Sequence, residues 1–128
     1  MQTGCIMSKT EKAGDFNMDC LFCKIVNGEI PSKVVYQDSK IIAFHDISPA
    51  APVHILVIPK THIASAADIR PVHSSLLAHL WSKIPQIAKE HGLSQFRVVT
   101  NSGEDAGQTV AHLHFHILGG HKLQGFFG

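Results

Sequence analysis

Hydrophobic and polar residues alternate along the chain with recognisable periods that predict its helices. In residues 20–26 the apolar positions follow helical spacing until Asn27-Gly28, which predicts a short helix. In residues 72–90 apolar positions recur every three or four places, which predicts a long amphipathic helix. Because Pro85 removes one backbone hydrogen bond inside the long helix, we expect a kink near residues 81–85 or a break on the solvent side.

Shorter runs rich in β-branched and aromatic residues, separated by turn residues, predict five strands. These runs are residues 33–37, 40–45, 53–59, 96–100 and 110–118. The first three follow one another closely, which indicates an antiparallel meander. The order of strands and helices lacks the βαβ alternation of a parallel sheet, so we expect an α+β fold.

The composition is that of one globular domain and excludes several function classes. The chain has 128 residues, of which 45% are hydrophobic and 16% are charged. Eleven lysines and arginines stand against 10 acidic residues without a dense basic run, so nucleic acid is not an expected partner. The longest apolar stretches, such as residues 53–59, are far shorter than the roughly 20 residues that span a bilayer, so no membrane segment is expected.

The first 17 residues mix charged, polar and glycine residues and lack the apolar core of a secretory signal. We therefore expect an intracellular, cytoplasmic protein whose single domain covers residues 18–128. Residues 1–17 are interpreted as a disordered arm, either natural or left from cloning, and no role is expected for Cys5 within it. Three cysteines do not suit a disulfide framework, so Cys20 and Cys23 are interpreted as thiols or metal ligands.

Three histidines at two-residue spacing, His112, His114 and His116, are the most informative feature of the chain. In a strand they would share one face, while Leu113 and Phe115 would point to the other face and into a core. Imidazoles change charge near neutral pH, so such a row can hold protons, a metal or phosphate. An exposed row without a function is the alternative, but an idle solvent face would more naturally carry lysine, glutamate and threonine.

His54 and the loop of residues 101–109 would belong to the same site if they lie beside the three histidines. His54 stands in the otherwise apolar run 53–59, where an imidazole needs a hydrogen-bond partner or a cleft. If that strand neighbours the histidine strand, His54 lines the same face; otherwise it is a satisfied core histidine. Residues 101–109 form a glycine-bearing loop whose amides could approach a ligand closely, although an ordinary hairpin loop has the same composition.

The run of residues 112–118 resembles the signature of the histidine triad superfamily of nucleotide hydrolases and transferases. Other segments resemble its branch of histidine triad nucleotide-binding proteins, so that the likeness covers residues 19–121. These segments are residues 44–49, 54–62, 101–109 and 119–120. The resemblance implies a five-stranded antiparallel sheet with one short and one long helix, extended across a homodimer. It also implies hydrolysis rather than transfer, because the third histidine is His116 and not glutamine.

The resemblance implies a covalent mechanism. His114 would attack the α-phosphorus of a nucleotide, and water would then release the nucleoside monophosphate from the nucleotidyl-imidazole intermediate. The backbone carbonyl of His112 would hold the ring of His114, and the side chains of His116 and His54 would contact phosphate oxygens.

The same resemblance assigns a binding site for an AMP-like purine nucleotide. Asp46 would bind the ribose hydroxyls. The residues expected around the base are Phe22, Ile30, Phe44 and Ile47, and those expected in the loop near the phosphate are Asn101, Gly107, Gln108 and Thr109. Core packing is the alternative explanation for the apolar residues, for Ile30 and Phe44 above all.

A Cys-x-x-Cys pair supplies only half of a tetrahedral zinc site. Many bacterial relatives complete such a site with two histidines, and the resemblance places these at His62 and His112. The implied structural zinc ligands are therefore Cys20, Cys23, His62 and His112. Two partly buried thiols without a metal are the alternative.

The function implied is that of a purine nucleoside phosphoramidase, which splits the P–N bond of adenosine 5′-phosphoramidates or lysyl adenylates to give AMP. A dinucleoside polyphosphate hydrolase is a second hypothesis. In that branch, however, Pro-Arg usually comes after the histidine triad, where this chain has Gly119-Gly120. A non-catalytic nucleotide-binding scaffold is a third. The tail after Gly120 departs from the aromatic, proline-rich ending of the branch, which leaves open the substrate preference and a role for Phe126 or Phe127.

Overall fold

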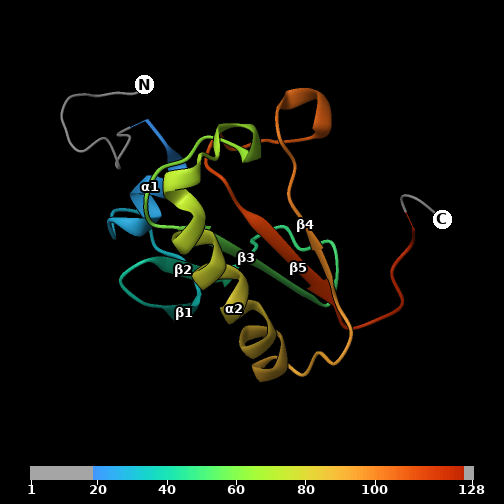
Figure 1. Cartoon of the computed structure of the whole chain (residues 1–128). Coiled ribbons are helices and arrows are strands. Elements are labelled where there is room, and N and C mark those ends of the chain that lie inside the picture. The colour runs from blue at the N-terminus through green and yellow to red at the C-terminus, as the bar shows by residue number, and fades with distance from the viewer. Residues whose placement is uncertain (1–18, 126–128) are drawn as a thin grey trace.

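The computed structural model describes residues 19–125, which fold around one antiparallel sheet flanked by helices (Figure 1). The elements are α1 (Leu21–Val26), β1 (Val34–Gln37), β2 (Ile41–His45), β3 (Val53–Pro59), α2 (Ser74–Glu90), β4 (Arg97–Val99) and β5 (Phe115–Gly119). Short 3-10 turns occur at Ala66–Asp68, Pro71–His73 and Glu104–Ala106. Each predicted helix and strand is present, and the α+β class is confirmed.

The five strands lie in the order β1-β2-β3-β5-β4, and each neighbouring pair is antiparallel. The first three form the predicted meander. The pairing of β3 with β5 places His54 and His116 on the same face, because His54 lies opposite Leu118 and Leu56 lies opposite His116. An extension of this sheet across a homodimer concerns a second copy of the chain and stays a prediction.

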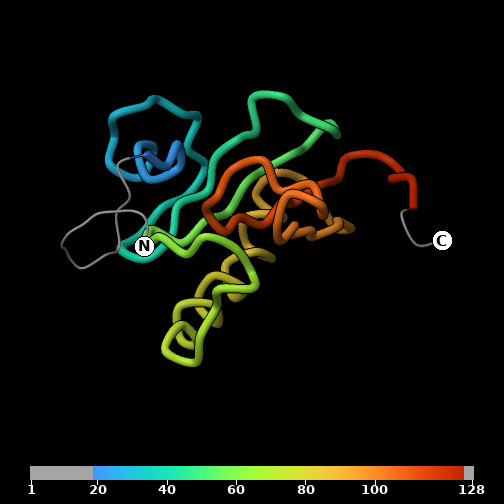
Figure 2. The backbone as a smooth tube through the Cα atoms, turned by 90° about the horizontal axis from the view of Figure 1, so that it is seen from above, coloured from blue at the N-terminus to red at the C-terminus, as the bar shows by residue number. Residues whose placement is uncertain are grey.

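The two faces of the sheet carry different layers, and Figure 2 shows α1 and α2 on opposite sides of the strands. The face toward α2 forms the larger core, to which the helix contributes Leu80, Ile84, Ile87 and Ala88. The opposite face packs against α1 with Ile42, Phe44, Leu56 and Ile58. The histidines of the triad lie on the α1 side, while Leu113, Phe115 and Ile117 are buried in the larger core, as the alternation predicted.

Helix α2 runs without interruption through Pro85, so the break that was one of the two predicted outcomes does not occur, and the kink stays a prediction. Pro85 lies on the exposed side of the helix, between the buried residues Ile84 and Ile87. The carbonyl of Trp81, which loses its helical donor at Pro85, can therefore bond to water instead. Packing of the buried stripe keeps the helix intact on both sides of the proline.

The last strand is shorter at its start than predicted, because β5 begins at Phe115 and not at residue 110. The backbone before it bonds elsewhere: the amide of Leu113 donates to Ile63 O at 2.6 Å, and the amide of His112 donates to Val110 O at 2.8 Å. These bonds compete with a regular ladder to β3. His112 and His114 therefore lie in an irregular segment, and only His116 lies in a strand.

The predicted arm of residues 1–17, the domain start at Met18, Cys5 and the tail residues Phe126 and Phe127 lie outside the described residues. Within residues 19–125, no helix combines the length and the apolar character that crossing a bilayer requires.

Candidate active site and metal centre

His114 is held in one tautomer by the backbone of its own triad. Its Nδ1 lies 2.6 Å from the carbonyl oxygen of His112, and a carbonyl can only accept, so Nδ1 carries the proton. The lone pair is therefore on Nε2. The hydroxyl of Thr100 donates to the carbonyl of His114 at 2.7 Å and fixes the backbone from the other side. Sequence reasoning missed Thr100, since a threonine near a strand end carries no distinctive signal.

The ring of His114 is 5% exposed and packs edge-on against Phe22, with 5.2 Å between the ring centroids. Burial lowers the pKa of His114, although its hydrogen bond to His112 opposes the shift. The imidazole is therefore neutral near pH 7, which is the form that has a lone pair to donate.

His116 and His54 form a hydrogen-bonded pair whose protons can be assigned from the backbone. The amide N–H of Ala50 donates to Nδ1 of His54 at 2.9 Å, so in neutral His54 the proton lies on Nε2. That Nε2 lies 2.8 Å from Nδ1 of His116 and donates to it. In neutral His116 the remaining proton is then on Nε2, which makes this nitrogen a donor. One backbone amide thus sets two tautomers.

Burial holds both members of this pair in the neutral form. It lowers the pKa of His54, against the influence of the Asp46 carboxylate, whose Oδ2 is 3.4 Å from Nε2 of His54. Burial, followed by the neighbouring His114 and His54, lowers the pKa of His116 to about 4. The site therefore contains neutral imidazoles near pH 7, each with a defined donor or acceptor nitrogen.

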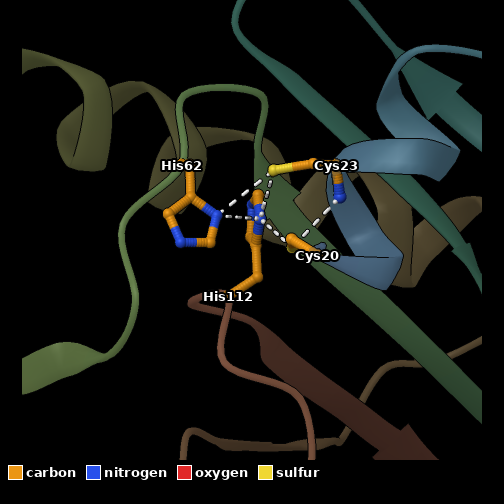
Figure 3. A group of neighbouring side chains, drawn as sticks. All are labelled: Cys20, Cys23, His62 and His112. Carbon is orange, nitrogen blue, oxygen red and sulfur yellow. Dashed lines mark hydrogen bonds between the residues drawn. The ribbon is translucent and has the colours of Figure 1, made fainter. Parts of the chain in front are cut away.

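A second set of side chains converges between α1, the segment after β3 and the segment before β5 (Figure 3). The ligand atoms of Cys20, Cys23, His62 and His112 all lie within 4.8 Å of one another. Nδ1 of His112 is 3.3 Å from Sγ of Cys20, 3.5 Å from Sγ of Cys23 and 3.2 Å from Nδ1 of His62. Sγ of Cys23 is 3.2 Å from Nδ1 of His62.

This geometry fits tetrahedral zinc. Zinc bonds of about 2.3 Å to sulfur and 2.05 Å to nitrogen place a sulfur–nitrogen pair about 3.5 Å apart and two nitrogens about 3.3 Å apart. Nε2 of His112 donates to the carbonyl of Pro59 at 2.8 Å, so Nδ1, which faces the cysteines, has the free lone pair. The four residues could therefore hold a metal ion, with no coordination position left for a substrate.

The environment of Cys20 favours the thiolate, the form that binds metal. The side chain of Cys23 lowers the pKa of Cys20 most, burial opposes this, and His112 and His62 add to the lowering, which leaves the pKa at about 2. Sγ of Cys20 also accepts the amide N–H of Cys23 at 3.2 Å and caps α1. The short helix is therefore anchored at its first turn to the cluster.

Asp46, His54 and His116 also lie close enough together to form a metal site, but the protonation of the His54 ring does not suit metal binding. The amide of Ala50 occupies the lone pair on Nδ1 of His54, which leaves Nε2 protonated and unable to act as a ligand. The two clusters thus differ in chemistry: one presents lone pairs to a common centre, and the other forms a chain of hydrogen bonds from Ala50 through His54 to His116.

A cavity of about 860 Å³ lies on the Asp46 side of the site, lined in part by Asp46, Ile47, His54, Lys33 and His45. Ile47 is 97% exposed, which suits a ligand contact better than a core position. Sequence reasoning missed Lys33 and His45, because nothing in their local pattern separates them from surface residues.

Phe22 and Phe44 were predicted to surround a base, and both are buried with their rings 5.5 Å apart. Both belong to the core cluster on the α1 side, and Phe22 also packs against His114, so Phe22 serves the core as well as the site. Ile30, also predicted at the base, is half-buried and does not line the cavity beside Asp46.

A second cavity, of about 1020 Å³, is lined in part by His116, Thr100, Asn101 and Arg97. Asn101 thus shares a cavity with His116, whereas Gly107 and Thr109 line neither cavity. The amide of Gly107 donates to the carbonyl of Glu104 at 2.9 Å within the loop. A role for this amide at a phosphate therefore requires the turn to open.

Comparison with known proteins agrees with this geometry. A family model described as "Scavenger mRNA decapping enzyme C-term binding" matches residues 19–126. Protein HitA of Neisseria gonorrhoeae is 48% identical over 102 residues, which cover 79% of this chain and 95% of that protein. The chain belongs to the histidine triad superfamily. The resemblance inferred from the sequence is confirmed.

Solved structures of histidine triad proteins share the fold. A histidine triad protein from Clostridium difficile is 51% identical with a TM-score of 0.82, and the match covers 86% of this chain and 97% of that one. A HIT family hydrolase from Legionella pneumophila Philadelphia 1 is 46% identical with a TM-score of 0.82, with 85% and 99% covered.

Close packing explains why residues 119 and 120 are both glycine, the pair that resembles the histidine triad branch. A Cβ on Gly119 would lie 2.9 Å from Cδ2 of Leu93 and 3.2 Å from the carbonyl of Gln95. Gly120 has φ of +102°, and a Cβ there would lie 2.8 Å from Cβ of Pro52. Both glycines let the end of β5 approach neighbouring backbone closely.

Proposed function

We propose that this histidine triad protein is a nucleotide hydrolase of the purine nucleoside phosphoramidase type, acting through a covalent nucleotidyl-His114 intermediate. The observation that carries the proposal is the 2.6 Å hydrogen bond from Nδ1 of His114 to the carbonyl of His112. It leaves Nε2 of a neutral, oriented imidazole as the nucleophile, with the donor nitrogen of His116 on the neighbouring ring, 5.0 Å away between centroids. The similarity to a protein named as a HIT family hydrolase supports the same class.

In the first step, the lone pair on Nε2 of His114 forms a bond to the α-phosphorus while the P–N bond of the substrate breaks. The electron pair leaves with the amine, which takes a proton from the histidine cluster or from water. The proton stays on Nδ1 of His114 and continues to donate to the carbonyl of His112, whose oxygen stabilises the positive charge of the substituted ring. Nε2 of His116 donates to a phosphoryl oxygen as charge spreads over the group.

In the second step, water attacks the same phosphorus, the bond to Nε2 of His114 breaks, and AMP leaves. The water proton goes to solvent, and His114 returns to the neutral tautomer. Asp46 accepts hydrogen bonds from the ribose, and Ile47 contacts the base at the edge of the same cavity. Asn101, which lines the same cavity as His116, supplies an amide donor, and Thr109 is proposed to supply a hydroxyl.

We further propose that Cys20, Cys23, His62 and His112 hold structural zinc, which would fix α1 and the triad to one centre. His112 then acts twice: its ring binds the metal through Nδ1, and its carbonyl orients the nucleophile. The two roles use different atoms and do not compete.

The substrate class is tested by giving the protein adenosine 5′-phosphoramidate and a diadenosine polyphosphate in parallel and measuring AMP. We expect kcat/KM to be higher for the phosphoramidate, because cleavage of its P–N bond requires only protonation of a departing amine. A preference for the polyphosphate would contradict the proposal in favour of the second hydrolase activity. Binding of AMP without product from either substrate would contradict it in favour of a scaffold.

The pH profile follows from the lowered pKa values of His114 and His116. We expect the acid loss of kcat/KM for the phosphoramidate to lie below 6.5, because burial lowers the pKa of the nucleophile His114 and also that of His116, to about 4. Below that value His116 gains a proton on Nδ1 and no longer accepts from His54. Because the unfolded state takes up this proton near 6.5, stability also falls between 6.5 and about 4, so unfolding is followed in parallel.

The rate of the His114→Ala variant is measured at each pH and subtracted from the wild-type rate, which corrects for acid hydrolysis of the substrate. A loss of kcat/KM centred near 6.5, the ordinary value for histidine, would show that His114 or His116 titrates as an exposed group and would contradict the buried, neutral state assigned to both rings.

A further inference from the structure

The loop between β4 and β5 carries predicted phosphate donors but contains no α-helix or strand to hold its shape. Three backbone bonds close it upon itself: Ala106 N to Gly103 O at 3.1 Å, Gly107 N to Glu104 O at 2.9 Å and Gln108 N to Gly103 O at 3.1 Å. Gly103 and Gly107 have φ of +90° and +96°, so the turn relies on residues that contribute no side-chain packing. Its position relative to the histidines must therefore come from other contacts.

The side chain of Gln108 supplies these contacts. Its Nε2 donates to the carbonyl of Ala64 at 2.7 Å and to the carbonyl of Val110 at 2.9 Å, and its Oε1 accepts from the amide of Gly103 at 2.8 Å. The partners define the orientation of the amide, since the carbonyls can only accept and the N–H can only donate. Both hydrogens of Nε2 are used, so none is left for a phosphate.

The three partners belong to three separate segments of the site. Ala64 lies two residues after His62, Val110 lies two residues before His112, and Gly103 lies within the loop itself. The half-buried side-chain amide of Gln108 thus joins the loop to the segment that carries His62 and to the segment that carries His112. A second, longer hydrogen bond, from the amide of Ala67 to Oγ of Ser102 at 3.2 Å, also joins the segment after β3 to the loop.

We propose that Gln108 is a positioning residue, which holds the loop of residues 101–109 in register with His114 and His116 and does not itself contact the nucleotide. This role rests on the proposed function and replaces the nucleotide contact that the resemblance implied for Gln108. Without the amide, Asn101 and the rest of the loop lose their fixed distance from the phosphoryl group, which affects the transition state more than the bound ground state.

Two substitutions separate this role from nucleotide binding. Gln108→Leu removes all three hydrogen bonds at similar volume. Gln108→Glu keeps the acceptor for Gly103 but turns an oxygen lone pair toward the carbonyls of Ala64 and Val110. A glutamate side chain regains one donor only when it is protonated. The loss of activity in Gln108→Glu should therefore become smaller as the pH falls.

We expect both variants to lower kcat for adenosine 5′-phosphoramidate about tenfold to a hundredfold at pH 7, with a change of less than about threefold in the Kd of AMP. The ratio of Gln108→Glu activity to wild-type activity should rise from pH 7 to about pH 5, while the ratio for Gln108→Leu stays constant. The matched control is Gln86→Glu on the exposed side of α2, which should leave all these values unchanged.

Hydrogen exchange gives a readout that does not depend on activity. In Gln108→Leu the amide of Gly103 should exchange at least about tenfold faster than in wild type, while amides in the core strand β3 keep their rates. A wild-type protein without hydrolytic activity would remove the proposed function and leave this measurement intact. Unchanged exchange at Gly103, or a raised Kd for AMP with unchanged kcat, would overturn the positioning role.

Discussion

His114→Ala is expected to lower kcat for adenosine 5′-phosphoramidate at least about a thousandfold. The substitution removes the only imidazole whose Nδ1 is held by a carbonyl of the triad and whose Nε2 is left as an acceptor among the described residues 112–116. The neighbouring His116 cannot take over, because its acceptor nitrogen is already bonded to His54. The rate is measured as AMP released under saturating substrate.

The control for this prediction is His121→Ala, which removes an exposed histidine beyond β5 and should leave kcat unchanged. Binding of AMP to His114→Ala, measured by calorimetry, should persist, since the ribose and base contacts are intact. Equal turnover by His114→Ala and wild type would show that another group or water attacks the phosphorus.

Cys23→Ser is expected to give the largest loss of stability. Cys23 is 1% exposed, and its sulfur lies 3.2 Å from Nδ1 of His62. With zinc bound in the wild type, the variant should lose the metal and at least about 3 kcal/mol of unfolding free energy. Two buried thiols without a metal would instead make the same substitution cost only about 1 kcal/mol.

Elemental analysis of purified protein and urea denaturation with and without a chelator measure the two quantities together. The matched control is Cys5→Ser, at a cysteine outside the described residues, which should keep both the metal and the stability. A chelator should destabilise wild type and leave Cys23→Ser unaffected. Metal-free wild type, or equal metal content in wild type and Cys23→Ser, would contradict the zinc site.

Local periodicity predicted the two faces around the triad and the strands, apart from the start of the last one. The apolar run of residues 53–59 became β3 with the predicted bounds, because continuous burial leaves few alternatives to a central strand. The alternation of His114 with Leu113 and Phe115 correctly separated the site from the core. The start of the last strand was wrong because Leu113 bonds to Ile63, a partner distant in sequence that no local pattern encodes.

The protons of the site could not be predicted from the sequence. The tautomers of His54 and His116 depend on the backbone amide of Ala50, and every residue except proline has such an amide. The same holds for Gln108, whose role follows from three backbone partners in three segments. Side-chain motifs show in the sequence, whereas backbone hydrogen bonds appear only once the chain is folded.

The central claim is that hydrolysis passes through a nucleotidyl-His114 intermediate, and the stereochemical course at phosphorus tests it most directly. The substrate is an adenosine 5′-phosphoramidate whose α-phosphorus is made chiral with sulfur, hydrolysed in water enriched in a heavy oxygen isotope. Two successive in-line displacements, first by Nε2 of His114 and then by water, each invert the phosphorus. The account therefore predicts net retention of configuration, and net inversion would contradict it by showing direct attack of water.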